Sequence, residues 1–257
     1  MKKLLHIIVF VLFSLTMASL MGFIVYEHSH QTIGDIKVKI SKTDNGGFLN
    51  KELFLNKIKE TEGIDTISIA DFDISGLENN ISNNPYVDHV DAFINIDRDL
   101  IINIKEREAL LRLYLPDNSS FYIDCNGKLF PLSSSFTPRI TIANGYIKVP
   151  QSYGEGCIYD SLYRNTELPE LYQLVRKISS NPFLSSQINQ IYVNSKGEYD
   201  LIPELGSHVI KFGKIDDLNE KLRNLESFYK RKLIKEGWEK YDIINLMYKN
   251  QIVCTKK

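Results

Sequence analysis

The chain has 257 residues, of which 43% are hydrophobic and 25% charged, a balance that excludes an intrinsically disordered chain and a polytopic membrane protein. A net charge of −1 gives no overall positive excess for binding nucleic acid, and three cysteines are too few for a disulfide scaffold. The charge is unevenly spread, because residues 27–110 carry 9 basic and 16 acidic groups whereas residues 211–257 carry 12 and 7. This asymmetry predicts separate modules.

An apolar segment stands near the N-terminus. Residues 4–26 contain no Asp, Glu, Lys or Arg, and a helix of that length crosses a hydrocarbon core of about 30 Å. Lys2 and Lys3 precede it, so the positive-inside rule places residues 1–3 in the cytoplasm and the rest of the chain outside. A cleaved signal peptide is the alternative, but the apolar run exceeds the about 7–15 residues of a signal-peptide core. We therefore expect an uncleaved anchor, followed by a linker over 27–32.

The next segment, residues 33–110, reads as a small α+β unit. Alternation over 33–40 predicts a strand, and Asn50 is expected to cap a helix whose apolar face carries Leu53, Phe54 and Ile58. Ser75 and Glu78 have the spacing of a capping box for a second helix. That helix has Leu77 and Ile81 on its apolar side and ends at Asn84-Pro85. Two alternating runs around Asp97-Arg98-Asp99 then predict a pair of strands, so the expected order is β-α-α-β-β.

Residues 111–254 show further strands and two helices. Hairpins are predicted at Asn126-Gly127 and at 195–197, with a helix over 168–180 between them. Asp217, with Glu220 at the capping-box position, is expected to open a long helix that ends near Gly237. The apolar face of that helix carries Leu218, Leu222, Leu225, Tyr229 and Leu233. Terminal strands are expected over 241–246 and 251–254, joined by a turn near Lys249-Asn250.

The stretch LENNISNNPYVDHVDAFINIDRDLIINIKEREAL, residues 77–110, resembles the second half of a POTRA domain, with a short helix ending in Asn-Pro-Tyr-Val, a hairpin and an Ile-Lys-Glu-Arg close. A single-pass chain with one such domain beside the membrane resembles the bacterial FtsQ family, called DivIB in some lineages. In that family a strand like SHVIKFG (207–213) leads to a long helix and then to an Asp-Leu-Arg-Tyr-type motif. Here Leu246 and Tyr248 match that motif, whereas Asn245 and Met247 replace its charged residues.

The resemblance implies an α+β fold with a transmembrane helix (4–26), a POTRA domain (33–110), and a β domain (111–254) with an antiparallel sheet and a long C-terminal helix, before a tail over 255–257. It also implies a non-enzymatic bitopic scaffold of the divisome, which recruits FtsB and FtsL to midcell and through them the septal peptidoglycan synthase. Such a protein lies in the cell inner membrane at the division septum, with its N-terminus cytoplasmic and its other domains periplasmic. No cofactor, nucleic acid or small-molecule substrate is implied.

Partner binding is expected by β-augmentation, because an edge strand offers unpaired main-chain groups to an extended segment. The last strand, around Tyr248–Val253, is the candidate edge, and Tyr248 is the expected anchor. A Tyr packed in the core or in a hairpin is the alternative. The basic C-terminal helix either helps an acidic partner or is a solvated face. The candidate partner-binding residues are Leu246, Tyr248, Lys249, Asn250, Gln251, Ile252 and Val253.

The common catalytic motifs are absent from the sequence, including HExxH, the P-loop and the Gly-x-Ser-x-Gly elbow. Gly154-Glu155-Gly156-Cys157 reads as a turn rather than a nucleophile site, and His28 with His30 gives too few ligands for a metal. The sequence does not decide whether Cys125 and Cys157 form a disulfide, or whether the O-glycosylation signals at Thr66 and Ser161 are used. The rival functions are a membrane-anchored periplasmic enzyme acting on the cell wall and a generic periplasmic scaffold. An outer-membrane assembly protein would need more membrane strands than the chain can hold.

Overall fold

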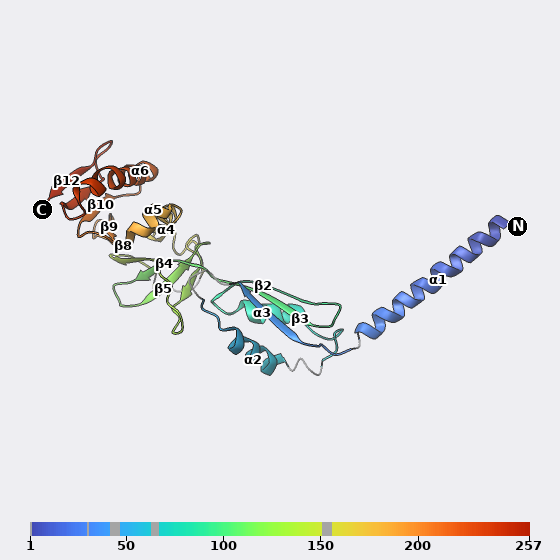
Figure 1. The fold of residues 1–257 in the computed structure, drawn as a ribbon. Helices are drawn as coiled ribbons and strands as arrows, with labels where there is room; N and C mark the ends of the chain where they lie inside the picture. The colour runs from blue at the N-terminus through green and yellow to red at the C-terminus, as the bar shows by residue number, and fades with distance from the viewer. Residues whose placement is uncertain (1, 30, 42–46, 63–66, 151–155) are drawn as a thin grey trace. The chain divides into compact units, whose positions relative to one another are not determined.

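The structure is a computed structural model that describes residues 2–29, 31–41, 47–62, 67–150 and 156–257 (Figure 1). The interpretations placed on His30, Thr66 and residues 154–155 lie outside the described residues. The first helix, α1 (Lys2–Ser29), contains the stretch His6–Glu27, whose side chains are not buried and whose mean hydropathy is 2.5. That stretch is long and apolar enough to cross a membrane, a test that a signal sequence near the N-terminus also passes.

The chain then forms two compact units, and the first comprises residues 1–42 and 49–106. After α1, its elements follow the predicted order β-α-α-β-β. Its three strands are ordered β1-β3-β2, with β1 parallel and β2 antiparallel to the central β3. Two helices supply apolar side chains to one face of this sheet, and the core includes Val38, Leu77, Leu100 and Ile102. The elements after α1 are β1 (Ile36–Ser41), α2 (Lys51–Glu62), α3 (Ile74–Ser82), β2 (Val87–Ile94) and β3 (Leu100–Glu106).

The cap predicted for the first of these helices is confirmed. Asn50 Oδ1 accepts hydrogen bonds from the Glu52 and Leu53 amides at 2.9 and 3.2 Å, which satisfies two donors of the first turn. The apolar face of α2 differs from the prediction, because the Leu53 side chain is 70% exposed whereas Ile58 is buried. Phe54 and Ile58 are four residues apart and share a face, while Leu53 is about 100° away from Phe54 around the helix.

The capping box predicted at Ser75 is wrong. Helix α3 begins two residues earlier, and Asp73 is its N-cap, accepting a hydrogen bond from the Gly76 amide at 2.8 Å. Ser75 therefore lies inside the first turn. The carboxylate of Glu78 instead accepts a hydrogen bond from the Ala92 amide at 2.7 Å, which ties α3 to strand β2.

The second unit comprises residues 43–48 and 107–257, and its nine strands are ordered β12-β11-β10-β9-β8-β7-β4-β5-β6. Its core is formed by helices packed on one face of this sheet. Phe48 also packs here, with its ring beside those of Tyr122, Phe130 and Phe136. The strands are β4 (Ala109–Tyr114), β5 (Ser120–Asp124), β6 (Leu129–Pro131), β7 (Thr141–Gly145), β8 (Ile188–Val193), β9 (Tyr199–Pro203), β10 (Val209–Gly213), β11 (Tyr241–Asn245) and β12 (Val253–Lys256). The helices are α4 (Leu168–Ser179), α5 (Pro182–Gln187), α6 (Leu218–Phe228), the π-helical η2 (Tyr229–Leu233) and α7 (Ile234–Glu236).

This sheet is mixed, so the predicted antiparallel sheet is wrong. The pairs β4/β7, β7/β8 and β10/β11 are parallel. Helices α4 and α5 lie between β7 and β8 in the chain, and α6 with η2 and α7 lies between β10 and β11. A helical crossover of this kind joins parallel strands. The two predicted hairpins and the helix over 168–180 are confirmed, as β5/β6, β8/β9 and α4.

The predicted long C-terminal helix is made of three consecutive pieces of 11, 5 and 3 residues, α6, η2 and α7. Its predicted apolar side chains are all buried. The predicted side-chain cap is wrong, because Asp217 has a φ of 50° and makes no capping hydrogen bond through its side chain. Gly237 ends the run as predicted, with a φ of 94° and its amide bonded to the Leu233 carbonyl.

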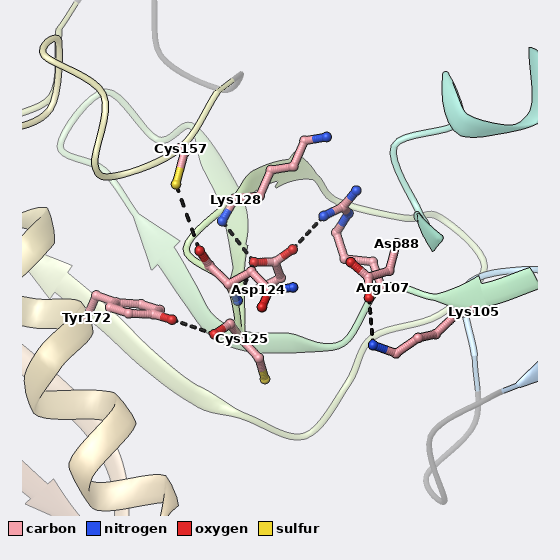
Figure 2. Close-up of polar contacts among 9 residues, drawn as sticks. Asp88, Lys105, Arg107, Asp124, Cys125, Lys128, Cys157 and Tyr172 are labelled. Carbon is pink, nitrogen blue, oxygen red and sulfur yellow. Dashed lines mark hydrogen bonds and ion pairs between the residues drawn. The ribbon is translucent and has the colours of Figure 1, made fainter. Parts of the chain in front are cut away.

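The β5–β6 turn is held from several sides (Figure 2). Asp124 Oδ1 accepts hydrogen bonds from the Asn126 and Lys128 amides, and its Oδ2 forms a buried ion pair with Arg107. The Tyr172 hydroxyl donates to the carbonyl of Cys125. Cys125 and Cys157 are free thiols in this structure, and Figure 2 shows their sulfur atoms on different sides of the turn.

Candidate partner-binding edge strand

The two edges of the large sheet differ in what covers them. At one end, β6 carries Pro131, which has no N–H, and the Leu129 amide donates to the carbonyl of Gly156 at 2.9 Å. The chain over 156–158 therefore covers that edge. At the other end β12 pairs with β11 alone. Within the described ranges, β12 is the uncovered edge of this sheet.

The hydrogen-bond pattern shows which main-chain groups of β12 point away from the sheet. The Leu246 amide donates to the Lys211 carbonyl at 2.9 Å, so the even-numbered residues at the end of β11 face β10. The odd-numbered Ile243 and Asn245 therefore face β12, where they pair with Thr255 and Val253. Because the bonding direction alternates along an antiparallel strand, the N–H and C=O of Cys254 and Lys256 point outward.

The seven predicted partner-binding residues lie in and beside this edge, with different exposure. Tyr248 and Val253 have side chains that are 52% and 44% exposed. Three more residues are exposed in the connecting loop: Lys249, Asn250 and Gln251. Ile252 is half-buried against the core, and Leu246 is buried, so Leu246 holds the loop from within. The predicted strand over 251–254 begins later, at Val253, and residues 246–252 form a loop in which Asn250 has a φ of 60°.

The start of this loop is fixed by Asn245 and Gly213. Asn245 Oδ1 accepts a hydrogen bond from the Met247 amide at 2.9 Å, which forms an Asx turn. Gly213 has a φ of 76°, and a Cβ built there would lie 2.9 Å from Met247 Cγ. The glycine therefore makes room for Met247, whose side chain is nevertheless 47% exposed beside Tyr248.

A groove of about 130 Å³ lies between the loop and the start of α6. One wall is formed by loop residues 246–252, and the other includes Asp216, Asp217 and Glu220. Lys221 is buried in this wall, where its Nζ donates to the Lys214 carbonyl at 2.9 Å and to Asp216 at 3.1 Å. The groove thus has three acidic side chains on the helix side and Lys249 on the loop side.

The opposite ends of β11 and β12 are held by two charged groups that the sequence did not single out. Glu236 Oε2 accepts hydrogen bonds from Lys240 Nζ at 2.6 Å and from the Tyr241 hydroxyl at 2.7 Å, and Lys232 lies 3.0 Å from Oε1. These donors lower the pKa of Glu236 to about 2, and Lys240 has the largest effect. The Glu236 carboxylate in turn raises the pKa of Tyr241 to about 12. Glu239 is likewise bonded by Lys257 and Ser207, which lowers its pKa.

No group of three or more His, Cys, Asp or Glu side chains that could hold a metal ion lies in the part of the chain that the structure describes. Cys157 sits in a turn, where its amide donates to Asp160 Oδ2 at 2.7 Å and Gly156 has a φ of 91°.

The structure thus defines an α+β protein with an N-terminal apolar helix, a small three-stranded unit and a larger mixed sheet in which β12 is the uncovered edge among the described residues. The sequence model of the family described as "FtsQ/DivIB, C-terminal related" matches residues 110–255. This match covers more than half of the chain, so the chain belongs to this family. It is also similar to the cell division protein DivIB of Clostridium tetani (strain Massachusetts / E88), with 24% identity over 247 residues, which are 95% of this chain and 87% of that protein.

Proposed function

We propose that this protein is a non-enzymatic division protein, anchored in the cytoplasmic membrane by α1, that binds partner division proteins through strand β12. The family match over residues 110–255 carries this proposal. The name of the Clostridium tetani relative supports the same role. The strand and helix order of the first unit supports its assignment as a POTRA domain over residues 33–110, followed by a β domain over residues 111–254.

The length of the apolar stretch supports the anchor. The 22 residues His6–Glu27 span about 33 Å as a helix at 1.5 Å per residue, which matches a hydrocarbon core of about 30 Å. Lys2 and Lys3, which precede the apolar stretch, support a cytoplasmic N-terminus by the positive-inside rule. Both compact units then lie outside the membrane, where an FtsB-like or FtsL-like protein is expected to bind them.

Partner capture proceeds by strand addition in this proposal. An extended segment of an FtsB-like protein bonds to the outward N–H and C=O of Cys254 and Lys256 and becomes a tenth strand. Tyr248, Met247 and Val253 present partly exposed apolar surface next to that position. Aromatic side chains with an apolar body and a polar tip dominate many interfaces, and for this reason Tyr248 is the anchor.

The binding proposal is tested with Tyr248→Glu and a matched control. Tyr146 also lies in the second unit and is 56% exposed, so Tyr146→Glu adds the same charge at a similar exposure away from β12. Affinity of the full chain for the FtsB-like protein of the same organism is measured in detergent micelles. We expect Tyr248→Glu to weaken binding by more than tenfold and Tyr146→Glu to leave it unchanged. Unchanged affinity in Tyr248→Glu contradicts the proposed site.

The cellular role is tested separately by imaging a fluorescent fusion of the full chain and by depleting the protein. Bands at midcell, with filamentous cells on depletion, are the expected result. A uniform membrane signal with normal division contradicts the division role and favours a generic scaffold or an anchored enzyme.

A further inference from the structure

The loop between β2 and β3 carries an apolar side chain at its tip. Ile96 is 91% exposed, more than any of the exposed apolar side chains of α1. Single exposed apolar residues are common on protein surfaces, but Ile96 lies at the end of a sheet face with further apolar side chains. Phe93, near the end of β2, is 44% exposed, and it pairs across the sheet with the half-buried Ile101 of β3.

The sheet face that points away from the helices changes character along its length. At the loop end it carries Phe93 and Ile101, with Lys37 of β1 next in the row. Further from the loop, the same face carries polar rows: Asp91 opposite Asn103, His89 opposite Lys105, and Lys39 beside Asn103. Apolar surface is therefore concentrated at one end of the face, the end that carries Ile96.

That end is tied to the start of the unit, directly after α1. The Gly34 amide donates to the Arg98 carbonyl at 2.8 Å, and the Leu100 amide donates to the Asp35 carbonyl at 2.9 Å. Helix α1 ends at Ser29, five residues before Gly34, and a fully extended chain of five residues spans at most about 18 Å. The loop is therefore tethered close to the membrane surface, and this step rests on the proposed membrane anchor.

We propose that the β2–β3 loop dips into the outer interface of the membrane, with Ile96 at the level of the upper acyl chains and Phe93 and Ile101 behind it. The partner is the lipid surface. Charge does not drive this contact, because Asp97 and Arg98 at the tip carry opposite signs and Asp99 is bonded to Lys37. Lys37 and Arg98 have long stems that let their charged ends stay at headgroup level. The contact fixes the first unit with its loop end against the membrane.

The test uses a tryptophan as a depth reporter in the full chain, reconstituted in phosphatidylcholine vesicles whose acyl chains are brominated near the headgroup, since bromine quenches tryptophan at close range. Trp238 is the chain's single tryptophan, so Trp238→Phe gives a silent background. The reporters are Ile96→Trp, Leu53→Trp and Phe23→Trp. Leu53 is a matched control because it is 70% exposed in the same unit. It follows Leu49, whose amide bonds to Glu106 at the far end of β3.

We expect the tryptophans at positions 96 and 23 to lose most of their emission in brominated vesicles, and the one at 53 to keep it. Quenching at position 23 with none at 96 overturns the loop contact and leaves the anchor intact. No quenching at position 23 overturns the anchor itself, and the loop contact with it. Equal quenching at positions 53 and 96 also overturns the proposal. Quenching at position 96 that high salt abolishes overturns it as well, because salt screens charge attraction but not apolar burial. If Trp238→Phe fails to fold, the same three variants are measured with Trp238 present and its emission subtracted.

Discussion

Asn245 Oδ1 accepts a hydrogen bond from the main-chain amide of Met247 at 2.9 Å, and this bond sets the direction in which the chain leaves β11. The resemblance to FtsQ leads to an expectation of charged Asp and Arg at these two positions. An aspartate oxygen occupies the same place as the asparagine Oδ1 and can form the same Asx turn. The turn that presents Tyr248 therefore depends on an oxygen acceptor at position 245 and not on its charge.

Asn245→Ala is predicted to weaken partner binding, whereas Asn245→Asp is predicted to retain it. Alanine removes the acceptor and leaves the Met247 amide without this bond, a loss of about 0.5–1.5 kcal/mol in typical cases. Affinity for the FtsB-like protein, measured for both variants beside the wild type, checks the prediction. Equal loss in the two variants contradicts it, because the acceptor would then be irrelevant.

Alanine substitutions at Gly213 and Gly237, both in the second unit, distinguish the cost of backbone strain from the cost of side-chain crowding. Both have positive φ, but a Cβ at Gly213 meets Met247 Cγ at 2.9 Å while a Cβ at Gly237 meets nothing within 4 Å. Gly237→Ala is predicted to cost about 1–3 kcal/mol of unfolding free energy, because its φ of 94° and ψ of 146° lie in a backbone region that is essentially restricted to glycine. Gly213→Ala is predicted to cost more and also to weaken partner binding by moving Met247. Urea unfolding and the binding assay check this, and an equal cost at both sites contradicts it.

Local patterns predicted much of this fold, because they report on buried faces. The alternating runs before and after Asp97 and the apolar stripe of α4 mark side chains that pack on a core, and such stripes recur at the period of their element. The expectation that Tyr248 lies near the sheet edge came instead from the resemblance to the FtsQ family. Asp73 was missed as an N-cap because both Asp73 and Ser75 stand before an apolar helix, and the backbone alone decides which begins it.

The remaining errors have a different cause. The neighbours of a strand in the sheet are set by packing between segments far apart in the chain, so β7 beside β4 and β11 beside β10 could not be read from periodicity. Strand β12 was placed too early for a related reason. Its residues from Val253 to Lys256 have no buried member, so the alternation that marks a half-buried strand is missing. The prediction therefore began the strand at Gln251, next to the half-buried Ile252, which lies in the loop.

The outward amide of Lys256 provides a direct test of strand addition. Lys256→Pro is predicted to weaken binding of the FtsB-like protein about tenfold, the equivalent of about 1.4 kcal/mol for one main-chain hydrogen bond. Proline is tolerated at an edge position whose N–H faces away from the sheet, so the fold is expected to persist. Lys256→Ala is the control, because it removes the side chain and keeps the N–H. Similar weakening in both variants indicates a side-chain contact and contradicts strand addition through this amide.

Glu236 is predicted to make the second unit sensitive to acid. The pKa of its carboxyl is lowered from 4.5 to about 2 by Lys240, Tyr241 and Lys232. Below pH 4.5 the unfolded chain binds a proton at this site while the folded chain does not, so protons favour unfolding. The stabilisation from Glu236 is therefore present above pH 4.5 and is lost as the pH falls towards 2. Glu236→Gln is expected to be less stable at neutral pH and to show a flatter dependence between those two values.

The measurement is urea unfolding at a series of pH values. Unfolding is monitored by the fluorescence emission of Trp238, which lies two residues from Glu236 in the chain. Glu204→Gln is the control, because Glu204 forms an ion pair at 3.1 Å with Arg139, whose side chain is 87% exposed, and exposed pairs contribute about 0–1 kcal/mol. Its pH profile should run parallel to that of the wild type. If Glu236→Gln keeps the wild-type slope of unfolding free energy against pH in the acid range, the prediction is contradicted. Other carboxylates, and not Glu236 between α7 and β11, would then determine the acid stability of the edge-strand region.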